Sequence, residues 1–208
     1  MAQAESTRPL SRLAAALAAS IFSLPAFAQL PSTDWIDFDA IDAGDVEIQT
    51  AKGRDSMVTV DVAIRINADR EVIWNILKAC EIAPQYAPNV EACRLIDSIN
   101  NGRSELFVQT VKPAFFIPRF EHVFRLDYDP PIRMGVRRVS GPIAQMDGDW
   151  WLLPRDDSIL LMHSLKIRSG LPVPKLFVRA TLKHDLPIVL EAVRDRAESA
   201  SAQQAQGL

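Results

Sequence analysis

Hydrophobic and polar side chains alternate strictly between residues 58 and 66. Every second position is apolar and lies on one face, and the positions between them carry Thr, Asp, Ala and Arg. This period of two is typical of a strand with one face buried in a core. A second alternating run begins at Val46, and the two runs are separated by residues 52–55. Residues 46–66 therefore predict either a hairpin or one long bent strand.

The period changes to that of a helix directly after this strand. The apolar positions that follow have helical spacing: Val72, Ile73, Ile76 and Leu77. Pro84 and Pro88 limit the next helical piece to one or two turns, because proline disrupts a helix interior. One strand followed by two short helices is therefore expected.

Six further strands are predicted between residues 91 and 168. Clusters of Gly, Pro, Asn and Asp separate them, and their approximate spans are 91–98, 104–112, 119–128, 132–140, 144–153 and 158–168. In the clearest case, residues 119–128, aromatic and apolar positions alternate with charged ones. Such short, regular spacing indicates an antiparallel meander.

A helical pattern returns after the last strand. Pro172 and Pro174 suit a helix start. The expected apolar face consists of Leu182, Leu186, Val189, Leu190, Val193 and Ala197. Pro187 lies within this pattern and predicts a kink or a break. Small and polar residues from Ser199 onward predict a fraying end, with residues 201–208 disordered.

The N-terminal segment has the pattern of a secretory signal peptide. Arg8 and Arg12 precede an apolar run over residues 13–24, and small residues precede a cleavage point after Ala28. A membrane anchor is the alternative, but the run is about half as long as a spanning helix. The predicted organisation is a signal peptide at 1–28, an irregular lead-in at 29–45, and one domain at 46–200. The mature protein is expected in the periplasm or outside the cell.

The net charge narrows the range of partners, and the two cysteines predict a disulfide. A net charge of −3 argues against a nucleic-acid partner, and no later segment is apolar enough to span a membrane. The two cysteines are Cys80 and Cys93. An exported protein meets an oxidising compartment, so an even count favours one disulfide between them. Two buried free thiols are the alternative.

The order of strand, two short helices, six strands and a long helix resembles the helix-grip fold of the START-like (SRPBCC) superfamily. The bacterial branch of polyketide cyclase/dehydrase and coenzyme-Q-binding proteins is the most similar. The resemblance depends on these segments: residues 72–77 (VIWNIL), 88–90 (PNV), 93–95 (CRL), 148–150 (GDW) and 172–174 (PVP). It implies an α+β fold in which a curved antiparallel sheet wraps around the long C-terminal helix.

The resemblance also implies a cavity between the sheet and that helix, which would suit a hydrophobic ligand. The residues expected to line it are Phe120, Phe124, Leu126, Met134, Val136, Trp151, Leu161, Leu165, Leu182 and Leu186. The alternative is that these side chains pack a filled core. The family is defined by its cavity rather than by fixed catalytic residues, so no catalytic motif is carried over.

Two histidines and one loop are the remaining candidates for function. His122 and His163 lie on apolar strand faces, where each is either a core residue or an acid, base or hydrogen-bonding group facing a ligand. Phe115 and Phe116 lie in an apolar loop between Pro113 and Pro118. Exposed, this loop would be a gate or a tip that contacts a membrane; buried, it would plug the end of the sheet.

No other motif points to chemistry. The histidines lack the spacing of zinc ligands, and no phosphate-binding glycine loop or nucleophile elbow occurs, so neither a metal nor a cofactor is predicted. The first hypothesis is a non-enzymatic periplasmic carrier of a lipid, isoprenoid or quinone-like molecule, with transient membrane contact. A cyclase/aromatase-like enzyme using His122 or His163 is the second, and an envelope scaffold with a filled core is the third. The sequence predicts no oligomeric state.

Overall fold

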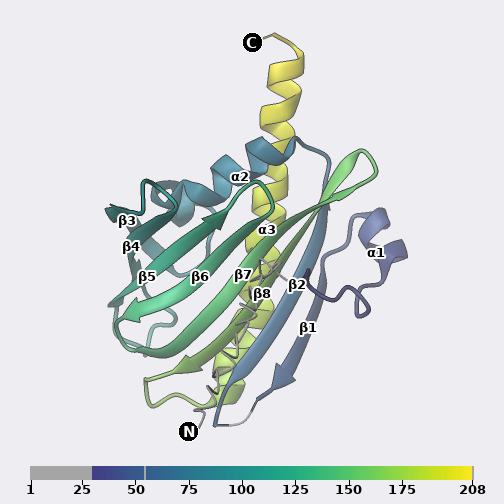
Figure 1. The fold of residues 1–208 in the computed structure, drawn as a ribbon. Helices are drawn as coiled ribbons and strands as arrows, with labels where there is room; N and C mark the ends of the chain where they lie inside the picture. Colours follow the sequence, from purple (N-terminus) through teal and green to yellow (C-terminus); the bar gives the residue numbers. More distant parts are fainter. Residues whose placement is uncertain (1–29, 54, 208) are drawn as a thin grey trace, which may run out of the picture. The chain divides into compact units, whose positions relative to one another are not determined.

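The fold is built on one antiparallel sheet of eight strands, in the spatial order β1-β2-β8-β7-β6-β5-β4-β3. It is seen in a computed structural model that describes residues 30–53 and 55–207. Figure 1 shows the sheet curving around the long helix α3. The predicted signal peptide, residues 1–28, lies outside the described residues and stays a prediction.

The elements follow the predicted order with one addition near the N-terminus, the helix α1. They are α1 (Phe38–Ala43), β1 (Glu47–Lys52), β2 (Val58–Ile66), α2 (Arg70–Lys78), the 3₁₀ helix η1 (Cys80–Gln85), β3 (Val90–Ile99), β4 (Ser104–Val111), β5 (Phe120–Asp129), β6 (Arg133–Ser140), β7 (Ile143–Arg155), β8 (Ser158–Ser169) and α3 (Lys175–Ala205). The run at 46–66 is a hairpin, because β1 and β2 pair antiparallel. The predicted α+β helix-grip architecture is confirmed.

The inner face of the sheet, defined here as the face toward α3, carries the main core. Alternate residues of β2 from Val58 to Ile66 are buried on it, as the pattern predicts. They pack with Ile73 of α2 and with Leu190 and Val193 of α3, all fully buried. The long helix is therefore held by apolar burial along the strand that opens the domain.

The helix α3 is longer and more regular than expected. It runs without interruption from Lys175 to Ala205 with Pro187 inside it, so of the predicted kink or break at this proline the break does not occur. The fraying predicted from Ser199 is also wrong, as is a disordered stretch beginning at residue 201, because helical structure continues to Ala205. Ala197, which comes shortly before this stretch, is buried completely in the core and anchors the helix there.

The segment before β1 is not irregular throughout, which corrects the expected lead-in at 29–45. Asp37 caps α1, because its Oδ1 accepts from the backbone N–H of Asp39 at 3.0 Å and of Ala40 at 3.3 Å. Gly44 ends the helix with a φ of +102°, which glycine adopts without strain. Ile41 of α1 is buried in a second cluster, on the outer face of the sheet.

Among the described residues no helix combines the length and the apolar character that crossing a membrane requires.

Candidate functional site

Two neighbouring cavities lie between the inner face of the sheet and α3. The first has a volume of about 240 Å³ and the second about 200 Å³. Gln109, His122 and Met146 line both of them, so a single layer of side chains separates the two. Neither alone reaches the roughly 300 Å³ typical of small-molecule sites, but together they do. A ligand of that size would have to occupy both.

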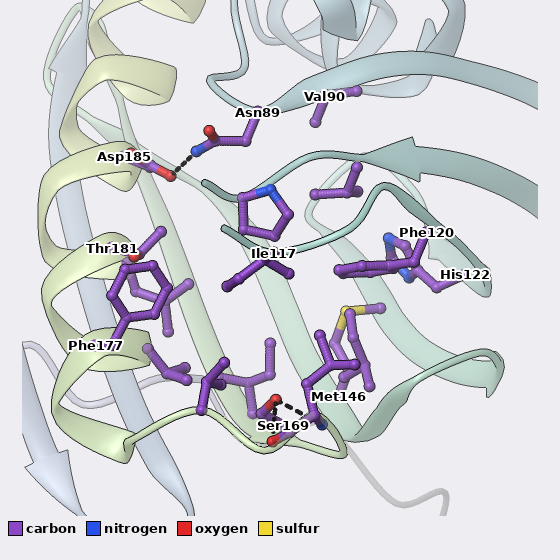
Figure 2. A pocket seen from close by; sticks show the side chains of 18 of the residues that line it. Asn89, Val90, Ile117, Phe120, His122, Met146, Ser169, Phe177, Thr181 and Asp185 are labelled. Atoms are coloured by element: carbon purple, nitrogen blue, oxygen red, sulfur yellow. Dashed lines mark hydrogen bonds between the residues drawn. The ribbon is translucent and has the colours of Figure 1, made fainter. Parts of the chain in front are cut away.

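The first cavity opens beside the start of α3 and the loop before β5 (Figure 2). Its wall is mostly apolar and includes Ile117, Phe120 and Phe177. At one side Asn89 Nδ2 donates to Asp185 Oδ2 at 2.7 Å, joining the loop before β3 to α3. This polar pair lies at one side of a mostly apolar wall, an arrangement that suits an apolar molecule with one polar end.

The second cavity lies deeper along the sheet. The disulfide between Cys80 and Cys93 forms part of its wall and ties η1 to β3. The predicted disulfide is therefore present, and the alternative of two free thiols is excluded. Apolar side chains from four strands and α3 complete the wall, in particular Phe124, Leu126, Val136, Trp150, Leu165 and Val189.

His122 lies in the layer between the two cavities. Its Nε2 is 2.9 Å from Oε1 of Gln109, so Nε2–H donates to the amide carbonyl, and its Nδ1 is enclosed without a partner. Its ring stacks on Phe124 with centroids 5.6 Å apart. Burial, and secondarily the charge of Arg138, lowers the pKa of His122 to about 4. The imidazole is therefore neutral at pH 7.

His163 lies in the wall of the second cavity. Its ring stacks on Trp150 with centroids 3.9 Å apart and planes at 14°. Nδ1 lies 3.3 Å from the backbone oxygen of Asp149. Burial lowers the pKa of His163 to about 4, against a smaller upward effect of the hydrogen bond to Asp149. Neither histidine is hydrogen-bonded to a carboxylate, so neither has the partner that orients a catalytic base in a triad.

Residues 66–194 match the family described as "Polyketide cyclase / dehydrase and lipid transport". The chain belongs to this family. The match begins at the last residue of β2 and ends within α3, so it includes every strand and helix that lines the two cavities. No curated protein matches the chain significantly.

Solved structures of the same fold come from several bacteria. A STAR-related lipid transfer protein fragment from Xanthomonas axonopodis is 15% identical, with 73% of this chain and 93% of that chain covered and a TM-score of 0.65. The Zhui aromatase/cyclase from Streptomyces sp. R1128 is 19% identical (68% and 94% covered, TM-score 0.57). A START superfamily protein from Mycobacterium smegmatis is 22% identical (68% and 98% covered, TM-score 0.59). At these identities the likeness establishes the fold.

In this polyketide cyclase and lipid transport domain, six of the ten predicted lining residues reach a cavity. Phe120 and Leu182 line the first; Phe124, Leu126, Val136 and Leu165 line the second. The other predicted positions on the inner side pack instead: Leu161 and Leu186 join the core between β2, β8 and α3, and Met134 is fully buried. These three are corrections: for Leu161 and Leu186 the reason is that the core between β2, β8 and α3 is filled.

Trp151 is the clearest error among the predicted residues, because it lies on the outer face. It packs there with Ile41 and Met162, whereas its neighbour Trp150 pairs with His163 and lines the second cavity. The alternation of β7 contained the signal: Met146, which lines both cavities, has the same parity as Trp150. Gln109 was also missed, a polar residue on a mostly apolar strand face.

The loop proposed as a gate is divided between interior and surface. Ile117 is buried and lines the first cavity, so the loop does plug this end of the sheet. Phe115 is 94% exposed and Phe116 is 56% exposed. The ring of Phe116 contacts that of Phe177 on α3 at 5.3 Å between centroids. The loop thus bridges to α3 over the first cavity while it presents two phenylalanines outward.

Within residues 30–53 and 55–207, no group of three or more His, Cys, Asp or Glu side chains is placed to hold a metal ion.

Proposed function

We propose that this protein is an exported carrier of a hydrophobic molecule, such as a lipid, an isoprenoid or a quinone-like compound. The observation that carries the proposal is the pair of mostly apolar cavities that share Gln109, His122 and Met146 as lining. Burial of a ligand there would contribute roughly 25 cal/mol for each Å² of apolar surface removed from water. The family's description includes lipid transport, which agrees with this use.

Export to the periplasm is the second part of the proposal. The charged, apolar and small-residue pattern of positions 1–28 supports it. The disulfide supports it as well, because such bonds persist in oxidising compartments. Protein recovered from the periplasm should therefore begin at Gln29, as its intact mass would show.

The exposed part of the loop at residues 113–118 is the proposed gate. Ile117 would have to leave the first cavity for a ligand to enter it, and Phe115 and Phe116 move with the same loop. Two exposed phenylalanines suit brief contact with a membrane from which a lipid is taken. The gate and the transient contact thus belong to one segment.

A cyclase/aromatase-like enzyme is less well supported. A general base works best with a pKa near the working pH, and the pKa of His122 and of His163 is about 4. Their hydrogen-bond partners are an amide and a backbone carbonyl, which do not stabilise the imidazolium ion as a carboxylate would. Unchanged turnover of a polyketide substrate in His122→Ala and His163→Ala would remove the histidine role.

Two substitutions on one strand test the carrier proposal. Val136 lines the second cavity, whereas Val139, on the same strand β6, is 46% exposed. Val136→Phe should reduce the fraction of protein that retains co-purified lipid about tenfold, since the added ring occupies the ligand's space. Val139→Phe should retain lipid like the wild type. Native mass spectrometry measures both, and wild-type protein that carries no lipid and binds none would contradict the proposal.

A further inference from the structure

The second cavity contains a hydrogen-bond acceptor without a partner, and this restricts the chemistry of its ligand. We propose that the second cavity selects a hydrophobic molecule with a hydroxyl group over the same molecule with a carbonyl, through a hydrogen bond from the hydroxyl to Nε2 of His163. This selectivity rests on the proposed carrier function and names the polar group of the ligand.

The position of the single imidazole proton follows from the backbone. The atom 3.3 Å from Nδ1 of His163 is the carbonyl oxygen of Asp149, which can only accept a hydrogen bond. The proton must therefore be on Nδ1. Because burial keeps this histidine neutral at pH 7, no second proton is present, and Nε2 carries a lone pair. Nε2 is thus an acceptor and not a donor.

The lone pair of Nε2 is available to a ligand. Nε2 makes no hydrogen bond within the part of the chain that the structure describes. Unlike Nδ1 of His122, it is not sealed off from a water-sized sphere. His163 lines the second cavity and is otherwise enclosed, with only 5% of its surface exposed. The open part of the ring therefore faces the cavity.

The ring is held against β7 by a stacking contact and by the hydrogen bond of Nδ1, so that Nε2 has a fixed direction. One face stacks on Trp150, the cross-strand partner of His163 in the β7–β8 pair. Beside it, a Cβ at Gly148 would lie 3.4 Å from Cε1 of His163 and only 2.6 Å from the carbonyl oxygen of Ser164. Glycine at this position therefore lets the ring lie close against β7. A fixed acceptor discriminates better than a mobile one.

The other polar residues of this wall do not offer the same group. Oε1 of Gln109 accepts from Nε2–H of His122, and Nδ1 of His122 is enclosed, so neither of these two acceptors is open to a ligand. Tyr86 also lines a separate depression beside Arg196, whose guanidinium lies 5.5 Å from the tyrosine ring. A carbonyl oxygen at the position of this hydroxyl would face the lone pair of Nε2, leaving two acceptors there without a donor between them. A hydroxyl ligand satisfies Nε2 and keeps its remaining surface among Leu126, Leu165 and the disulfide.

Matched probes test the selectivity. After extraction of bound lipid, the purified protein is titrated with 2-undecanol and with 2-undecanone, which differ only in hydroxyl against carbonyl. We expect the alcohol to bind about fivefold or more tightly than the ketone. His163→Phe, which retains an aromatic ring to stack on Trp150, should reduce this ratio to about one. His184→Phe, the same substitution at a histidine exposed on α3, should leave the ratio unchanged.

Nitrogen NMR of the wild-type protein provides a test that does not depend on the folding of a variant. In the ligand-free protein the proton of His163 should be found on Nδ1, and the Nε2 resonance should move with 2-undecanol but not with 2-undecanone. A proton on Nε2, or equal affinity for the two probes, would overturn the selectivity and leave the carrier function standing. If neither probe binds and no lipid co-purifies, the carrier function fails together with it.

Discussion

At the scale of single residues, the two cavity histidines make the stability of the fold depend on pH. Both are neutral when folded because burial disfavours the imidazolium ion, while in an unfolded chain each would have a pKa near 6.5. Between about pH 4 and pH 6.5 the unfolded chain therefore binds more protons than the folded one. The free energy of unfolding therefore rises with pH across this window and falls as the pH drops through it.

The first prediction concerns this pH window. Between pH 7 and pH 4.5, each histidine should cost the folded state about 2 kcal/mol. His163→Phe should lose less stability than the wild type over the same change, by about this amount. Unfolding in urea at the two pH values measures it, with His184→Phe as the control.

Carboxylates such as Asp42, whose pKa is lowered first by the hydrogen bond from Arg155, contribute equally to all three proteins. Identical losses in wild type and His163→Phe would show that folding does not lower the pKa of His163.

At the scale of elements, alternation predicted the strands well and their faces only in part. The inward positions of β5 at residues 120–126 all line a cavity, because one uninterrupted period relates them. On β7, Trp150 and Trp151 are both large and apolar, since α1 covers the outer face where Trp151 lies. The local pattern therefore could not separate the two. Only the packing of α1, a segment without an apolar period of its own, does so.

The sequence also could not predict whether an inward-facing residue lines a cavity or fills the core. Leu161 and Leu165 lie on the same face of β8, yet Leu161 packs against the core under α3 and Leu165 lines the second cavity. The difference depends on the distance between α3 and the sheet at each point. That distance is a property of the tertiary packing, and the hydrophobic pattern of β8 does not predict it.

The second prediction concerns the link between η1 and β3. The disulfide joins residues 13 apart in the sequence, and closing such a loop stabilises the fold by about 3 kcal/mol in the chain-entropy model. Cys80→Ala combined with Cys93→Ala should lower the free energy of unfolding by about this amount. Because both cysteines line the second cavity, retained lipid should fall as well. Unfolding in urea and native mass spectrometry measure the two effects. A double variant as stable as the wild type would contradict this account.

At the scale of the whole domain, the sheet separates two sets of contacts with different roles. Its inner face contacts α3 and encloses both cavities, whereas its outer face carries the cluster of Ile36, Ile41, Trp151 and Met162. Adjacent residues of one strand belong to different sets, as Met162 and His163 do. Arg155 donates to Asp42 at 2.6 Å, fastening α1 to the end of β7. Stability and ligand binding should therefore be separable by substitution.

The third prediction uses this separation. Ile41 is completely buried on the outer face, so Ile41→Ala should lower the free energy of unfolding by about 2–4 kcal/mol through the cavity it leaves. Lipid retention, measured well below the unfolding temperature, should stay at the wild-type level, because none of the described residues that line the two cavities belongs to this cluster. Val136→Phe should give the opposite result, with lipid lost and the fold retained. If Ile41→Ala released lipid as completely as Val136→Phe does, the sheet would be transmitting changes between its faces. The packing of α1 would then affect ligand binding through the sheet.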